Sequence, residues 1–304
     1  MSTVASSPAV ATLSSRDSIV HVFDTFRDEL DDYHDRRERL IKSSRDVTNL
    51  SKKVIFLLHR MMTEDASESD DRALSMRAVS RAKEKLRDIQ KLFAGMREEV
   101  AGDRFWRYQR NVSPGLQEYI EALSFAHYLE FRTLISYDEV QKTISDEDGK
   151  PVRFTIASAV PQCLTSSTQY FPLPMEDYLL GLADLTGELM RYAISSISRR
   201  GGRSKASEVC VFVRGLTIDF EVFIPSFREL RKKQQVTSQS LEKIEDVAYA
   251  IAVRSSEYDL PPELLDDIVD RTVSTTAYGG NGDGRDRRRG GRGRNDEFDE
   301  GDDD

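Results

Sequence analysis

Residues 15–63 contain neither proline nor glycine, and apolar side chains recur through them at alternating spacings of three and four. This ladder comprises Ile19, Phe23, Phe26, Leu30, Tyr33, Leu40, Val47, Val54, Leu58 and Met61, and it misses at Arg37, Ser44 and Ser51. At 3.6 residues per turn the pattern predicts one helix of about twelve turns. Because so long a helix is marginal in isolation, it must pack along a bundle or a partner.

The composition favours an elongated helical protein over a compact α/β enzyme. Of 304 residues, 38% are hydrophobic and 32% are charged, and the 17 glycines gather near the C-terminus. No alternation typical of strands stands out against the helical spacing. We therefore predict an all-α fold of long antiparallel helices with disordered ends: residues 1–14 as a disordered N-terminus, 15–270 as the helical domain and 271–304 as a disordered tail.

Further helices are predicted downstream of the first. Pro114–Gly115 is a candidate break in the third, and Ser136 is expected to cap a short helix with Glu139 at its third position. Residues 146–174 hold four of the nine prolines and are expected to be an irregular connection, and Gly201–Gly202 a turn. The expected helices cover residues 72–100, 104–134, a short stretch after Ser136, 175–199, 206–223, 227–253 and 261–268.

Several functional classes are disfavoured. Cys163 and Cys210 lie far apart, without the spacing of a zinc site, which favours reduced thiols in an intracellular protein. Residues 1–15 lack the apolar core of a signal peptide, and no apolar run approaches the length of a membrane span. The net charge of −9 confines any nucleic-acid site to a local patch.

Four carboxylates in two predicted helices are the strongest candidates for chemistry. Glu118 and Glu121 are three residues apart, and Asp184 and Glu188 are four apart, so each pair shares one face of its helix. Both pairs lie among apolar residues, where an unpaired carboxylate is costly. If the helices face each other, the acids would repel unless they are protonated or bound to metal.

Mg²⁺ is the cation that this set of oxygen ligands suits, and a water retained by the ion can attack a phosphodiester. Carboxylates from facing helices are an established way to build such a site in a bundle. The alternative is that the acids lie on the solvated faces of amphipathic helices, as most acids do. The spacing of the four acids alone does not decide between a metal site and a solvated helix face.

Two segments are candidates for nucleic-acid binding. Residues 104–110 interleave cations with aromatic rings, which suits phosphate pairing and base stacking, and the candidates are Arg104, Trp106, Arg107 and Arg110. The alternative is a helix end with arginines that reach into solvent. Residues 279–293 are rich in glycine and arginine and precede an acidic stretch, which favours weak RNA binding or nuclear import, or a merely solubilising tail.

Three blocks of sequence resemble the translin family, and within it the translin-associated branch rather than translin itself. They are residues 34–61, which include the run Val54–Arg60; residues 115–136, which begin Gly-Leu-Gln-Glu-Tyr-Ile-Glu; and residues 177–190. The resemblance spans most of residues 20–255. It implies an all-α fold of about seven helices that assembles with translin into a hollow hetero-octamer.

The resemblance also implies a Mg²⁺-dependent endoribonuclease that cleaves single-stranded RNA, with single-stranded DNA as a second candidate ligand. The family's acidic site falls on Glu118, Glu121, Asp184 and Glu188, whereas translin-like sequences lack the full set. The expected location is the cytoplasm and the nucleus. The segment from Arg104 aligns loosely with a basic region that binds nucleic acid in translin.

The division of roles among the acids is a hypothesis: Glu121 and Glu188 as the more direct metal ligands, with Glu118 and Asp184 completing the shell or orienting the attacking water. The main alternative is a non-catalytic subunit that binds nucleic acid or acts as a scaffold stabilising translin. A coiled-coil adaptor, suggested only by the first helix, is a third hypothesis.

Overall fold

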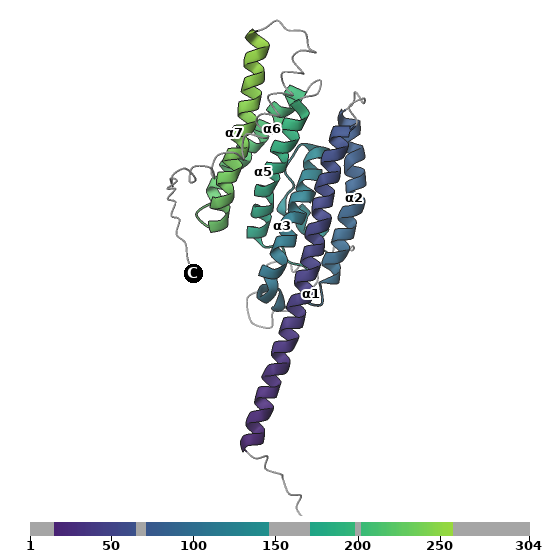
Figure 1. Cartoon of the computed structure of the whole chain (residues 1–304), viewed down its shortest axis with the longest axis vertical. Coiled ribbons are helices and arrows are strands. Elements are labelled where there is room, and N and C mark those ends of the chain that lie inside the picture. Colours follow the sequence, from purple (N-terminus) through teal and green to yellow (C-terminus); the bar gives the residue numbers. More distant parts are fainter. Residues whose placement is uncertain (1–14, 65–70, 146–170, 198–201, 258–304) are drawn as a thin grey trace, which may run out of the picture.

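The computed structural model describes residues 15–64, 71–145, 171–197 and 202–257, and within them it contains seven α-helices and no strand. This confirms the predicted all-α fold (Figure 1). The helices are α1 (Ser15–Glu64), α2 (Asp71–Gly95), α3 (Arg104–Phe131), α4 (Tyr137–Thr143), α5 (Met175–Ile197), α6 (Gly202–Phe223) and α7 (Arg228–Glu257).

Helix α1 is the continuous 50-residue helix that its ladder predicted, about 75 Å long at 1.5 Å per residue. Only its C-terminal half is buried in the bundle, where Leu40, Val47 and Val54 are fully covered. The N-terminal part projects beyond the other helices (Figure 1), and its ladder residues Phe23 and Phe26 are 68% and 58% exposed. The apolar ladder of α1 is therefore buried in the bundle over its C-terminal half and exposed to solvent in the projecting part.

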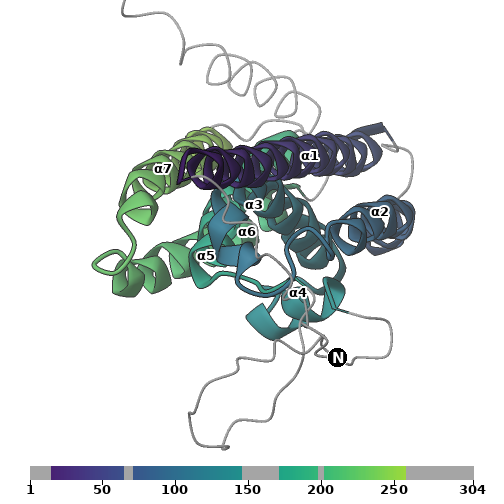
Figure 2. The same cartoon turned by 90° about the horizontal axis from the view of Figure 1, so that it is seen from below.

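The helices of the bundle run in two directions, as the pairs of contacting residues show. Along α1 and α3, Ser44 meets Val112 and His59 meets Phe125, so the two helices run the same way. By equivalent pairings α5 and α7 share this direction, whereas α2 and α6 run against it. Figure 2 shows the bundle from below, with α3 between α1 and α5. Helices joined by short connections are antiparallel, while α3 returns to a parallel α5 only through the long segment that contains α4.

Helix α3 runs through Pro114 without the break that the sequence suggested. The proline has no N–H to donate, and Ser44 of α1 makes hydrogen bonds to the α3 backbone beside it. The Ser44 hydroxyl accepts from the Gly115 N–H at 3.1 Å and donates to the Val112 carbonyl at 3.4 Å. A Cβ on Gly115 would lie 2.6 Å from the Ser44 carbonyl oxygen, so glycine permits this close approach. Ser44, a polar residue at a position where the ladder would place an apolar one, thus lies where α1 contacts the backbone of α3.

Helices α2 and α3 each end earlier than the sequence predicted. Helix α2 ends at Gly95 rather than at residue 100, and a series of turns follows to residue 103, including Gly102 at a φ of +68°. Helix α3 ends at Phe131 rather than at residue 134 because Arg132 adopts a left-handed conformation with a φ of 60°. The Arg132 side chain stays ordered through bonds to Asp71 and to the Tyr192 hydroxyl.

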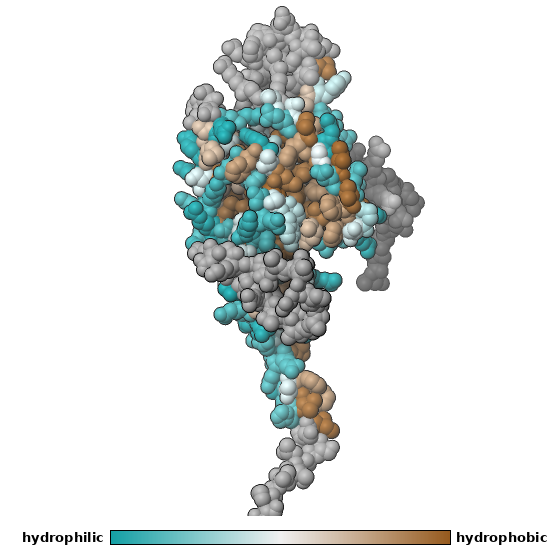
Figure 3. Space-filling model, turned by 180° about the vertical axis from the view of Figure 1, so that it is seen from behind, coloured by the Kyte–Doolittle hydropathy of each residue, from teal (hydrophilic) through white to brown (hydrophobic). Residues whose placement is uncertain are grey.

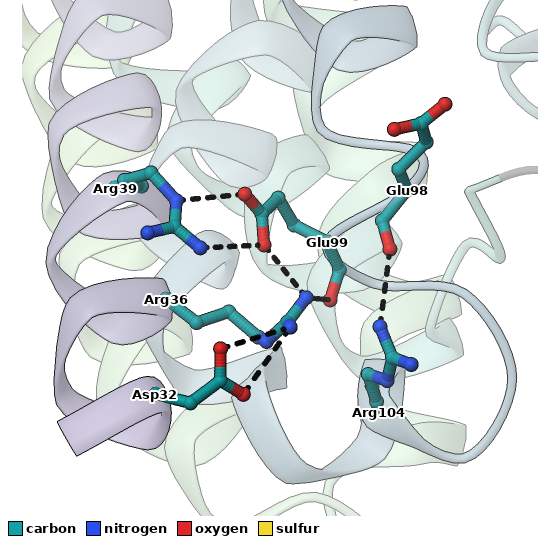
Figure 4. A network of polar contacts seen from close by, with 6 residues as sticks. All are labelled: Asp32, Arg36, Arg39, Glu98, Glu99 and Arg104. Carbon is teal, nitrogen blue, oxygen red and sulfur yellow. Dashed lines mark hydrogen bonds and ion pairs between the residues drawn. The ribbon is translucent and has the colours of Figure 1, made fainter. Parts of the chain in front are cut away.

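A network of charges ties the turn after α2 to α1 (Figure 4). The Glu99 carboxylate accepts from Arg36 and from Arg39 at 2.7 Å, and Arg36 also pairs with Asp32 one turn earlier. The hydrogen bond from Arg39 lowers the pKa of Glu99, although partial burial opposes it. The network lies near the level at which α1 leaves the bundle.

The remaining helices follow the sequence with shifted ends. Ser136 and Glu139 form the predicted capping box at the start of α4. Gly202 is the first residue of α6 and not part of a turn, and α7 extends to Glu257 rather than to residue 253. The predicted terminal tails, residue 201, most of the irregular connection (146–170) and the helix at 261–268 lie outside the described residues.

Apolar side chains gather in two regions of the face seen in Figure 3. Figure 3 shows one brown patch on the body, on the face opposite to that of Figure 1, and another at the projecting end of α1. The second comprises the exposed Ile19, Phe23, Phe26 and Leu30. None of the described helices is long and apolar enough to cross a membrane.

Candidate acidic pocket

The two helices that carry the acids approach closely at a single glycine. A Cβ on Gly181 of α5 would lie 2.7 Å from the Ile120 Cβ and 2.9 Å from the Gln117 carbonyl oxygen of α3. Gly187 of the same helix makes no such contact, since a Cβ added there would meet no atom within 4 Å. The contact at Gly181 brings the acid-bearing faces of α3 and α5 together.

All four predicted carboxylates line one pocket of about 670 Å³. The acids come from α3 and α5, and the facing wall is the C-terminal half of α1. The lining residues are Lys52, Ile55, Phe56, His59, Glu118, Glu121, Asp184, Glu188 and Arg191. Apolar residues on the same two helices lie in the core, since Phe125, Tyr128 and Leu180 are at most 5% exposed.

Three of the acids are paired with cations of the chain itself. Lys52 of α1 lies 3.1 Å from Glu118, and Lys233 of α7 pairs with Asp184. Glu188 is bound by two groups: His59 Nε2 at 2.6 Å and Arg191 at 3.2 Å. These cations offset much of the repulsion that the clustered acids would otherwise create.

Glu121 is the exception, because within the described residues no ion pair reaches it. Burial, and then the negative charges of Asp184 and Glu188, raise its pKa to about 8. Glu188 is also buried, which raises its pKa, but the hydrogen bond from His59 and the charge of Arg191 outweigh that effect and its pKa is lowered. The pocket thus holds one acid that keeps its proton near neutral pH beside one that does not.

The donor set fits Mg²⁺ in chemistry but is not arranged as a finished metal site. In the part of the chain that the structure describes, no three His, Cys, Asp or Glu side chains converge in a geometry ready to hold a metal ion. Four hard carboxylate ligands are nevertheless within one pocket, and hard cations prefer such oxygen ligands. A divalent cation would compete here with the ammonium groups of Lys52 and Lys233.

The structure adds residues that the sequence interpretation did not assign to the site. Lys52, Phe56 and His59 have the spacing of one helix face, a signal that was present in the sequence. The His59 ring packs against Phe125, at 4.8 Å between centroids, and it also reaches Glu188. Lys233 lies too far along the chain for any local spacing to connect it with the acids.

Asp177 is a further acid that the sequence analysis did not single out. It is 3% exposed and accepts hydrogen bonds from Ser113 at 2.8 Å and from Gln117 at 2.7 Å. These bonds join the first turn of α5 to α3, so this carboxylate fixes the relative height of the two helices.

The candidate nucleic-acid segment does not join the pocket. Arg104, Trp106, Arg107 and Arg110 all lie exposed in the first two turns of α3, with Trp106 63% exposed. Arg104 donates to the Glu98 carbonyl (Figure 4), and the Arg107 guanidinium lies 5.0 Å from the centre of the Tyr33 ring. Fourteen residues separate Arg104 from Glu118, which is about 20 Å along a helix.

Comparisons with known proteins agree with the fold and with the resemblance of the three sequence blocks. The translin family model matches residues 35–255. Mouse translin-associated protein X is 37% identical over 263 residues, which cover 85% of each chain. The crystal structure of apo-NeC3PO superposes with a TM-score of 0.54 at 18% identity, over 79% of this chain and 98% of that one. The structure of AfC3PO with duplex RNA gives a TM-score of 0.50 at 20% identity, over 76% and 97%.

The match to the family model extends from the middle of α1 nearly to the end of α7, so it includes every residue of the acidic pocket. The similarity to the translin-associated branch, predicted from the sequence, is confirmed by the identity to the mouse protein. The chain belongs to the translin family.

Proposed function

We propose that the chain is the endoribonuclease subunit of a complex with translin and that it cleaves single-stranded RNA with the help of Mg²⁺. The observation that carries the proposal is that Glu118, Glu121, Asp184 and Glu188 line one pocket. Two supports come from relatives: one is described as translin-associated, and AfC3PO, of the same fold, forms a complex with duplex RNA.

The ion, when bound, would polarise a phosphodiester and lower the pKa of a bound water. Glu121 and Glu188 are the ligands that we propose as most direct. The hydrogen bond from His59 fixes one oxygen of Glu188, as groups behind a metal ligand commonly do. Glu118 and Asp184, which pair with Lys52 and Lys233, would orient the attacking water or accept its proton.

The test is cleavage of a labelled single-stranded RNA by the chain co-purified with its translin partner, in Mg²⁺ and in EDTA. We expect cutting in Mg²⁺ only, and a loss of at least about a hundredfold in Glu121→Ala, because a metal ligand and its charge are removed. Glu84→Ala, which removes an exposed acid of α2, is the matched control. RNA binding and the mass of the complex should stay unchanged in both variants.

The second candidate function is a scaffold subunit in which the acidic pocket is structural and does not cleave RNA. Because Glu118, Asp184 and Glu188 are paired with cations of the chain, the cluster also suits a scaffold subunit whose ion pairs hold α1, α3, α5 and α7 together. Under that function, both the wild-type complex and the Glu121→Ala complex would bind RNA, and neither would cut it with or without Mg²⁺. Dissociation of the complex by the same substitution would mean that the acids are structural.

A further inference from the structure

Phe56 is an aromatic ring in an unusual position. It lines the acidic pocket, yet it is 67% exposed, whereas its neighbours Ile55 and Leu58 on α1 are at most 6% exposed. No aromatic partner contacts its ring among the described residues, although Phe125 and Phe93 each contact others. The ring therefore contributes little to the core, and its apolar face is available at the mouth of the pocket.

The surroundings of Phe56 on the helix surface are basic. The positions three and four residues away on α1 are Lys52, Lys53, His59 and Arg60, and the two lysines and Arg60 are exposed. Across the pocket, Arg191 of α5 is 64% exposed in its side chain. An apolar patch that bound a protein would be expected to continue onto neighbouring apolar residues, but the exposed side chains one turn away from the ring on α1 are cationic, and the carboxylates lie on the opposite wall of the pocket.

A flat ring flanked by cations matches the chemistry of single-stranded nucleic acid, in which bases stack on aromatic faces and phosphates pair with lysine or arginine. We propose that Phe56 stacks a nucleobase of single-stranded RNA at the mouth of the pocket, with Lys52 and Lys53 facing the adjacent phosphates. This rests on the proposed function and adds a substrate-positioning residue to it. Bases in a duplex are already stacked on each other, so the contact selects single strands.

The experiment uses the full chain in complex with its translin partner, a fluorescein-labelled oligouridylate, and EDTA to prevent cleavage. Phe56→Leu keeps an apolar side chain but removes the ring, and we expect a loss of affinity on the order of tenfold, the range of one base–aromatic stack. Phe131→Leu is the matched control, since that ring is 57% exposed near the far end of α3 and outside the pocket. Affinity for the same strand annealed to oligoadenylate should be unchanged in both variants.

Phe56→Trp provides a direct signature of stacking. It should restore the affinity, and its fluorescence should be quenched when oligouridylate is added. The natural Trp106 and any tryptophan of the partner are subtracted by a parallel titration of the complex that retains Phe56. A purely structural role for the ring would produce neither the quenching nor the rescue.

The outcomes separate this proposal from the nuclease proposal. Weaker binding in Phe56→Leu, with the mass of the complex intact, supports stacking even if the wild-type complex never cuts RNA, in which case only the nuclease proposal fails. Cleavage by the wild type together with unchanged affinity in Phe56→Leu overturns stacking alone. Dissociation of the complex by Phe56→Leu also overturns it and makes Phe56 a contact between subunits.

Discussion

At the scale of single residues, Glu121 is the acid of the pocket whose negative charge is most strongly disfavoured. Its three acidic neighbours have cations of the chain beside them, and its pKa is about 8 because burial and those neighbours disfavour its charge. An acid in this state would be a poor metal ligand until it loses its proton. Mg²⁺ binding should therefore release a proton and tighten as pH rises.

The raised pKa of Glu121 predicts how stability depends on pH without metal. Between about pH 4.5 and 8 the folded chain holds a proton that the unfolded chain has lost, so stability falls as pH rises through that window. Glu121→Gln keeps the shape of the protonated side chain and removes this loss. We expect the variant to be more stable than the wild type above pH 8 by ~2 kcal/mol, and nearly equal to it at low pH.

Thermal melts in EDTA across this pH range measure the effect. The control is Glu84→Gln, which alters an exposed acid of α2. If Glu121→Gln and wild type keep a constant difference in stability at every pH, then Glu121 is not the protonated group.

At the scale of helices, the approach of α5 to α3 decides whether the acids share a pocket. Gly181 lies against Ile120 and Gln117 between the two pairs of acids, while Gly187, six residues on in the same helix, lies against nothing. The two glycines are therefore a matched pair within one helix.

We predict opposite effects of alanine at these glycines. Gly181→Ala puts a methyl group within 2.7 Å of the Ile120 side chain, which forces the helices apart and destabilises the fold by about 1–3 kcal/mol. Gly187→Ala meets no atom and improves helix propensity, so it should stabilise by up to about 1 kcal/mol. Urea unfolding of both variants gives the comparison, and equal effects would mean that Gly181 is not a tight contact.

At the scale of the whole molecule, the projecting part of α1 exposes apolar side chains that no other described helix covers. Ile19, Phe23, Phe26 and Leu30 are each more than half exposed and continue the ladder that is buried further along the helix. An exposed apolar stripe of this length is typical of a surface that another chain covers.

We predict that Phe23→Asp with Phe26→Asp weakens assembly without unfolding the bundle. The T-shaped pair of rings, 6.4 Å between centroids, has no contact with the core, so its removal should leave the melting temperature of the bundle unchanged. Light scattering after size exclusion would then give a smaller mass than for the wild type, alone or with translin. An unchanged mass would show that this stripe is not an interface.

The sequence by itself determined the features that depend on local spacing. A proline-free and glycine-free ladder fixes α1 as a helix, the capping box fixes the start of α4, and three- and four-residue spacings put each pair of acids on one face. The resemblance of the three blocks, which follow one another in the family's order, also identified the family. Helix ends were less accurate where one backbone angle decided them, as at Arg132.

Only the tertiary structure decided which surroundings each of those residues has. Periodicity shows that a face is apolar but not what covers it, so the ladder of α1 has the same spacing where Leu40 is buried and where Phe23 projects into solvent. Spacing likewise cannot bring α1 and α7 to the acids. Lys52, Phe56 and Lys233 joined the candidate site only through the parallel packing of helices distant in sequence, and the two lysines form ion pairs there with Glu118 and Asp184.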